Sequence, residues 1–217
     1  MKKVIAPTAT AHKNQIREEI FRIIKNAQLS YVENGPAAGS KKDLRDAPEY
    51  FLTAHIAEGL GGKFKTLRYE LEYAVVNFAK FFRKQTDVDF LAELKKAVPR
   101  VGGRFDIVLT GEKGLPRYAV EVKLGPKFAN DVKRMACLAR MNHGRKRWNY
   151  GFVATLMRRS NADDVKNKII EDLKTAHVDN KIINAINFEN SIRELGNSKI
   201  EGKRLFAFVC VINLSSE

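Results

Sequence analysis

The chain is poor in cysteine and has no long apolar run. Cys137 and Cys210 are the only two cysteines among 217 residues, and neither has a partner at zinc-ligand spacing, so we expect two reduced core thiols rather than a metal site or a disulfide scaffold. No apolar stretch approaches the roughly 18 residues of a membrane span. The apolar part of the first residues is also shorter than the about 7 residues of a secretion signal. We therefore expect a cytoplasmic protein without a membrane partner.

Acidic residues are scarce relative to basic ones, with 25 Asp and Glu against 39 Lys and Arg and a formal net charge of +14. Such an excess favours a polyanionic partner, and nucleic acid is the first candidate. The asymmetry is strongest in residues 132–162, which contain no acidic residue but eight basic ones and Trp148. We interpret this stretch as a track for phosphates beside an indole that can stack on a base. The alternative is a basic face that only keeps the protein solvated.

The length suits one domain, which we divide into an N-terminal helical extension (1–45), a core (46–160) and a C-terminal elaboration (161–217). Apolar residues at helical spacing alternate along the chain with short runs rich in β-branched and aromatic residues. We expect helices over 13–32, 46–59, 74–82, 88–98, 127–142 and 162–176, and strands over 69–73, 150–157 and 205–214.

Residues 102–124 read as two strands joined by a turn that contains Gly111, Gly114 and Pro116. A symmetric antiparallel hairpin would place Asp106 nearly opposite Glu121. Side chains alternate between the faces of a strand, so Glu121 shares its face with Lys123. Two carboxylates opposite each other are destabilising unless positive charge lies between them, which indicates either an ammonium group or a divalent cation.

Asp106, followed after a turn by Glu121-Val122-Lys123, resembles the signature of the PD-(D/E)XK nuclease superfamily, although Phe105 stands where that signature has proline. The flanking residues 103–109 and 120–125 are similar to the corresponding strands of that superfamily. The resemblance implies an α/β fold in which a central mixed sheet is flanked by helices, with an αβββαβ restriction-endonuclease-like core. It further implies hydrolysis of phosphodiester bonds in DNA, with Mg²⁺ or Mn²⁺ as cofactor and a homodimer as a possible assembly.

The resemblance also implies roles for particular residues. Asp106 and Glu121 would hold the metal, and Lys123 would steer the attacking water or offset charge on the phosphate. Glu49 would complete the acidic set from a preceding helix. A second interpretation of Glu49 remains open, since Asp46 can act as a helix N-cap with Glu49 as the third residue of a capping box.

The residues expected to contact nucleic acid are basic residues near the hairpin and along the basic stretch: Arg104, Lys127, Lys133, Arg134, Arg145, Lys146, Arg147, Arg158 and Arg159. Two other interpretations of the whole protein stay open. In the first, it is a non-cleaving nucleic-acid-binding or regulatory protein on the same fold. Alternatively, Glu121 and Lys123 form only cross-strand ion pairs, with Arg104 and with Glu112 or Lys113, which would contribute under about 1 kcal/mol and need no metal.

Overall fold

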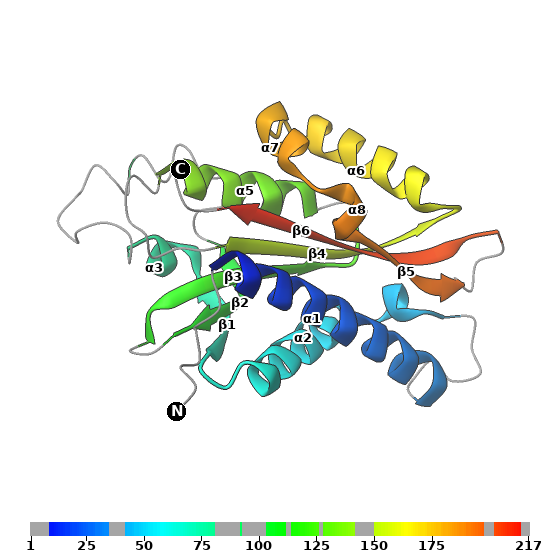
Figure 1. Cartoon of the computed structure of the whole chain (residues 1–217), viewed down its shortest axis with the longest axis horizontal. Coiled ribbons are helices and arrows are strands. Elements are labelled where there is room, and N and C mark those ends of the chain that lie inside the picture. The colour runs from blue at the N-terminus through cyan, green and yellow to red at the C-terminus, as the bar shows by residue number, and fades with distance from the viewer. Residues whose placement is uncertain are drawn as a thin grey trace, which may run out of the picture.

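The structure, a computed structural model, describes residues 9–34, 42–80, 92, 103–111, 114–125, 128–141, 150–197 and 202–213. Within these ranges, six strands form one sheet in the order β1-β2-β3-β4-β6-β5 (Figure 1). Strands β3 and β4 pair in parallel and all other neighbours pair antiparallel, so the sheet is mixed. The strands are Arg68–Ala74 (β1), Arg104–Thr110 (β2), Pro116–Lys123 (β3), Tyr150–Arg159 (β4), Ile192–Asn197 (β5) and Arg204–Asn213 (β6).

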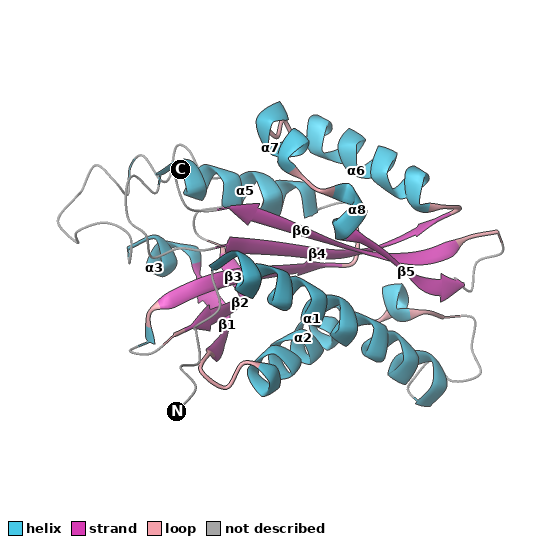
Figure 2. Cartoon of the chain, in the orientation of Figure 1, coloured by secondary structure: helices cyan, strands magenta, loops and turns pink. Residues whose placement is uncertain are grey.

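Helices cover both faces of this sheet (Figure 2). Helices α1 and α2 lie on one face, whereas α5 and α6 lie on the other. The helical segments are Ala9–Leu29 (α1), the π-helical turn Ser30–Asn34, the 3-10 turn Leu44–Asp46, Glu49–Lys63 (α2), Val75–Lys80 (α3), Phe128–Met141 (α5), Ala162–Thr175 (α6), Asn180–Ala185 (α7) and Phe188–Ser191 (α8).

Helix α1 presents the apolar stripe that its period predicts. Ile16, Ile20 and Ile24 are fully buried, and they belong to the same cluster as Val120 and Val122 of β3. Burying an aliphatic side chain of this size contributes about 1.5–3 kcal/mol, so the stripe is sufficient reason for α1 to cover the sheet. Helix α2 packs beside it at Gly59, where a Cβ would lie 2.5 Å from Ile23 Cδ1. The glycine therefore permits the close approach of the two helices.

The opposite face of the sheet is covered by α5 and α6. Phe128 and Val132 of α5 pack with Val153 of β4 and Phe208 of β6, and all four side chains are fully buried. The rings of Phe128 and Phe208 meet edge to face with centroids 5.7 Å apart. Because side chains alternate along a strand, β3 contributes Ala119 to this cluster while its neighbours face α1 and α2.

Most of the expected elements are present. The strand predicted at 205–214 is β6, which is buried on both faces because side chains from its two faces enter the two clusters. The helix predicted at 162–176 is α6, capped by Asn161. The start of the helix predicted at 46–59 was wrong, because α2 begins at Glu49 and Asp46 closes a separate 3-10 turn. The helix predicted at 88–98 lies outside the described residues apart from a helical residue 92. Strand β5 and helices α7 and α8 were not anticipated.

Both cysteines are reduced, with Cys210 buried and Cys137 half-buried. Burial raises the pKa of the Cys210 thiol to about 12, which makes it an inert core residue. No helix in the described part of the chain is both long and apolar enough to cross a bilayer.

Candidate active site

The hairpin of β2 and β3 has the predicted register. Ile107 pairs with Val120 and Leu109 pairs with Tyr118, and the register shifts only at Thr110, next to the turn. The same register carried one residue beyond Ile107 places Asp106 opposite Glu121. The two carboxylates therefore come from adjacent strands at the end of the ladder that lies away from the turn.

Asp106 is held in place by the backbone of the neighbouring strand. Its Oδ2 accepts a hydrogen bond of 2.7 Å from the backbone N–H of Val122. The pair Ile107 and Val120 is the last pair of Cα partners in the ladder, so a side-chain oxygen takes over where backbone pairing stops. The carboxylate of Asp106 thus has a fixed position without any bound ligand.

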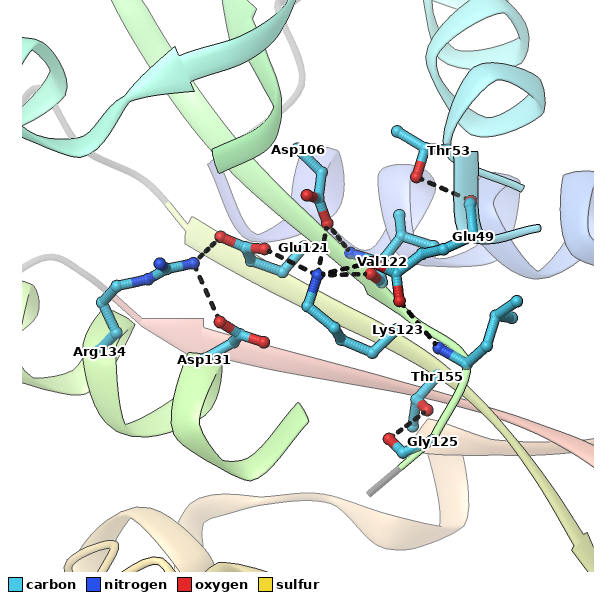
Figure 3. A network of polar contacts seen from close by, with 11 residues as sticks. Glu49, Thr53, Asp106, Glu121, Val122, Lys123, Gly125, Asp131, Arg134 and Thr155 are labelled. Carbon is cyan, nitrogen blue, oxygen red and sulfur yellow. Dashed lines mark hydrogen bonds and ion pairs between the residues drawn. The ribbon is translucent and has the colours of Figure 1, made fainter. Parts of the chain in front are cut away.

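Lys123 lies at the point where the acidic side chains meet (Figure 3). Its Nζ is 3.1 Å from Glu49 Oε1, 3.2 Å from Asp106 Oδ2 and 3.7 Å from Glu121 Oε2. The same ammonium group donates to the carbonyl oxygen of Val122 at 2.9 Å. Burial opposes the positive charge, but the carboxylates of Asp106, Glu121 and Glu49 outweigh it and raise the pKa of Lys123. Lys123 is therefore a charged ammonium group at neutral pH.

Glu49 reaches the site from the first residue of α2, and it does not cap this helix. The N-cap position is Pro48, which makes no side-chain cap. The carboxylate of Glu49 instead accepts hydrogen bonds from Lys123 Nζ at 3.1 Å and from the backbone N–H of Leu124 at 3.4 Å. Of the two interpretations that the sequence leaves open, the capping box is wrong. That motif is formed one turn earlier, by Asp43 and Asp46.

Glu121 is the most buried acidic group of the site, with a side chain only 1% exposed. Burial and the nearby charge of Asp106 raise its pKa to about 9, although the cations Arg134 and Lys123 act in the opposite direction. A buried carboxylate with a raised pKa beside other charged groups is typical of functional sites, because folding alone gives little reason to place it there.

Helix α5 contributes two further charged residues to this cluster. Arg134, whose side chain is 6% exposed, donates through Nη2 to Glu121 and lies 3.0 Å from Asp131 Oδ1. Its guanidinium carbon stacks 5.2 Å from the ring centroid of Phe105. Both ion pairs are made by Nη2. The Nε atom has no hydrogen-bond partner among the described residues. The alternative pairing of Glu121 with Arg104 is wrong, since Glu121 pairs with Arg134 and Lys123. The other partners in that alternative, Glu112 and Lys113, lie outside the described residues.

The donor set of the cluster fits a hard divalent cation. Three carboxylate oxygens and the carbonyl oxygen of Val122 surround Lys123 Nζ, and Mg²⁺ and Mn²⁺ prefer oxygen ligands of this kind. The carboxylates converge on the ammonium group rather than on one another. In the described part of the chain no three His, Cys, Asp or Glu side chains are close enough to hold a metal ion as they stand. Binding of a cation by Glu49, Asp106 and Glu121 would thus require Lys123 to move aside.

The basic residues predicted to contact nucleic acid divide into three groups. Arg104 is exposed and Lys133 and Arg159 are half-buried, so these three side chains can still meet a ligand at the surface. Arg134 is buried, and Arg158 is bound by Asp43 and Asp46, so both are occupied by carboxylates of the chain itself and we leave them out of the nucleic-acid surface. The remaining four, together with Trp148, lie outside the described residues: Lys127, Arg145, Lys146 and Arg147.

Sequence reasoning missed Asp131 and the carbonyl oxygen of Val122. Asp131 and Arg134 are three positions apart on a helix, which is the spacing at which opposite charges meet, and that spacing was available in the sequence. A backbone carbonyl has no such signal, since its direction depends on how the strand ends. Comparisons with protein-family models, curated proteins and solved structures find no match to this chain, so its relation to the superfamily stays a prediction from the motif.

Proposed function

We propose that this protein is a divalent-metal-dependent nuclease that hydrolyses phosphodiester bonds in DNA. The observation that carries the proposal is the convergence of Glu49, Asp106 and Glu121 on the ammonium group of Lys123. These residues come from three different elements. The sequence motif named Asp106, Glu121 and Lys123, and Glu49 was a candidate from the preceding helix. Structural ion pairs are usually made at the surface, whereas this cluster includes a carboxylate that is 1% exposed.

The element order supports a restriction-endonuclease-like core within the mixed α/β sheet. Among the described elements, helix α2 is followed by β1, β2, β3, α5 and β4, with the short helix α3 inserted after β1. This is the αβββαβ order that the motif implies. The parallel pairing of β4 beside β3, with α5 as the crossover, is the part of the topology least expected by chance in a largely antiparallel sheet.

The side chains suit hydrolysis at phosphorus. Asp106 and Glu121, with Glu49, would hold the metal ion, which when bound would lower the pKa of a water molecule and offset phosphate charge. Asp106 is already oriented by the Val122 amide, so little rearrangement is needed at that ligand. Lys123, displaced from the carboxylates, would orient the attacking water or stabilise charge on the phosphate.

The charge of the protein supports nucleic acid as the substrate. The net charge of +14 favours a polyanion, and the basic stretch of residues 132–162 follows the site directly in the chain. Arg104, Lys133 and Arg159 are the described members of that set with accessible side chains. They would bind the phosphate backbone and so position the strand without reading its sequence.

The test is cleavage of a labelled panel of single-stranded, double-stranded and branched DNA, and of RNA, with Mg²⁺ or Mn²⁺ and with EDTA. We expect metal-dependent cleavage of DNA that stops in EDTA. Asp106→Asn, Glu121→Gln and Lys123→Met should each abolish cleavage while DNA binding persists. Lys168→Met is a matched control, because Lys168 also bridges two carboxylates, Glu171 and Asp172, but lies on α6 outside the site.

Binding of DNA without cleavage of any substrate in the panel would contradict the proposal. It would favour the second interpretation, a non-cleaving nucleic-acid-binding or regulatory protein. In that protein the ammonium group of Lys123 would serve as the permanent counter-charge of the three carboxylates.

A further inference from the structure

We propose that Arg158 is a positioning residue that fixes Glu49 in the site through the turn at residues 43–46. This inference rests on the proposed function for its catalytic consequence, but not for its structural part. Arg158 is thereby assigned to positioning Glu49 and no longer to the binding of phosphate.

Arg158 lies at the end of β4 and binds two carboxylates of this turn. Its Nε is 3.0 Å from Asp43 Oδ2 and its Nη2 is 2.8 Å from Asp43 Oδ1, so the ion pair is bidentate. Nη2 also donates to Asp46 Oδ2. The Asp43 side chain is 0% exposed and that of Arg158 is 14% exposed, so solvent screens this pair weakly. The hydrogen bonds to Asp43 and Asp46 raise the pKa of Arg158.

The turn is also held by hydrogen bonds within it and by contacts with α1. Asp43 accepts from the backbone N–H of Arg45, and Asp46 accepts from the backbone N–H of Asp43, which closes a capping box. The backbone N–H of Leu44 donates to Gln28 Oε1 of α1 at 2.8 Å, and the Leu44 side chain is fully buried. The turn is thereby tied both to α1 and, through Arg158, to the sheet.

Glu49 follows this turn after only Ala47 and Pro48, and α2 has no side-chain cap of its own at Pro48. Proline fixes one backbone angle and Ala47 is buried, so the connection has little freedom. The location of Glu49 relative to Lys123 therefore depends on where the turn is held. Arg158 holds the turn from strand β4. This strand is the neighbour of β3, and Thr155 of β4 pairs with Lys123 of β3.

The pair demands a guanidinium group. Arginine offers several donors in a fixed plane and can bind both oxygens of Asp43 while reaching Asp46, whereas lysine offers a single ammonium group. Arg158→Lys keeps the charge and removes this geometry. Asp46→Asn is a milder companion variant, because Asp46 is 33% exposed and its amide retains a hydrogen-bond acceptor.

The structural test is hydrogen exchange of the backbone amides of Asp46, Ala47 and Phe51, which bond within the turn and the first turn of α2. We expect Arg158→Lys to speed their exchange about tenfold while amides of β6 are unchanged. Arg22→Lys is the matched control: Arg22 also binds both oxygens of a buried carboxylate, that of Glu19, but both residues belong to α1. It should leave the three amides as they are.

The functional test compares Arg158→Lys, Asp46→Asn, Glu49→Gln and the double variant Glu49→Gln/Arg158→Lys. Loss of a residue that orients a metal ligand typically costs 10–100-fold in metal affinity or activity. We expect Arg158→Lys to lower kcat and Mn²⁺ affinity by about tenfold at an unchanged KM for DNA. In the Glu49→Gln background it should have almost no further effect, because two residues acting through one contact are not additive.

Three outcomes would overturn the inference. Unchanged exchange at the three amides would show that Arg158 does not hold the turn. Full additivity with Glu49→Gln would show that it does not act through Glu49. A raised KM with a shallower salt dependence of binding would return Arg158 to the phosphate contacts. If the wild-type protein cleaves no nucleic acid, the proposed function fails, and the exchange experiment still decides whether Arg158 holds the turn that leads into Glu49.

Discussion

The carboxylate of Asp106 replaces a backbone acceptor opposite Val122, since Oδ2 accepts the Val122 amide at 2.7 Å where the β2–β3 ladder ends. One side chain thus completes the hairpin and supplies a charge to the site. These two roles can be separated, because an amide oxygen can fill the first role but not the second.

We predict that Asp106→Asn abolishes metal-dependent cleavage with little loss of stability. Asp106→Ala should abolish cleavage too, and it should also lower the free energy of unfolding by about 1–3 kcal/mol, because the amide of Val122 loses its acceptor. Urea denaturation of both variants, monitored by circular dichroism, measures the difference. Equal stabilities of the two variants would mean that this hydrogen bond does not stabilise the hairpin.

Removal of Arg134 should destabilise the protein through Glu121. Breaking a buried ion pair by deleting one partner typically costs about 3–5 kcal/mol, since the other charge is left buried. We expect Arg134→Met to cost less than this, because Glu121 keeps Lys123 at 3.7 Å and its raised pKa lets it take up a proton. We also expect Glu121→Gln/Arg134→Met to be clearly more stable than the sum of the two single changes predicts. A double-mutant cycle by urea denaturation gives the coupling energy. Strict additivity would contradict the pairing of these residues.

Metal ions should stabilise the folded protein even without substrate. A ligand present at 100 times its Kd and bound only by the folded state adds about 2.7 kcal/mol. We therefore predict that Mn²⁺ raises the Tm of the wild-type protein, and that Asp106→Asn and Glu121→Gln remove the rise. Calcium-free, EDTA-treated protein is the reference state. An equal rise in the wild type and both variants would place the metal elsewhere.

The stability of the protein should fall on mild acidification, partly through His12. Burial lowers the pKa of His12 below its ordinary value of 6.5, and its Nδ1 lies 2.8 Å from the hydroxyl oxygen of Tyr118. The unfolded chain takes up the proton first, so stability present above pH 6.5 is lost as the pH falls toward the lower pKa of the folded state. His12→Gln should show a smaller difference in Tm between pH 7.5 and pH 5. An unchanged difference would assign the acid sensitivity to other groups.

The role of the basic stretch can be tested with substitutions at residues 145–147, which lie outside the described residues. Replacing Arg145, Lys146 and Arg147 by alanine should weaken DNA binding and make the slope of log K against log salt shallower by about 2–3. The control replaces three exposed lysines of α6 and α7 and should leave the slope unchanged: Lys166, Lys174 and Lys181. If the two triple variants behave alike, the basic stretch only adds net charge.

The hairpin at the centre of the site could be predicted from the sequence because the residues that determine it are close together in the chain. Strand alternation and a symmetric turn are sufficient to bring Asp106 and Glu121 together, and the observed register agrees. Glu49 could be predicted only in part, since its residue type and position suit both a ligand and a cap. Its contact with Lys123 depends on packing between segments 74 positions apart.

Arg134 and Arg158 show where such prediction fails. A sequence shows that a residue is basic, but not whether a carboxylate already binds it. Arg158 meets Asp43 from 115 positions away, so no local pattern could have shown the pair. Burial decides the role of a charged side chain, and burial is a property of the assembled sheet and helices.

The location of α1 has a consequence for how the chain folds during synthesis. The isoleucine stripe of α1, an N-terminal helix, is buried against Leu205, Ala207 and Val209 of β6, near the other end of the chain. Strand β6 is made after α2, β3 and β4, which share this cluster with α1, so part of the docking surface of α1 is missing until β6 has left the ribosome. Closure of so long a loop is slow and leaves apolar surface exposed meanwhile. We expect truncation before β6 to yield an aggregating chain that chaperones retain, even though the residues of the β2–β3 hairpin are all present.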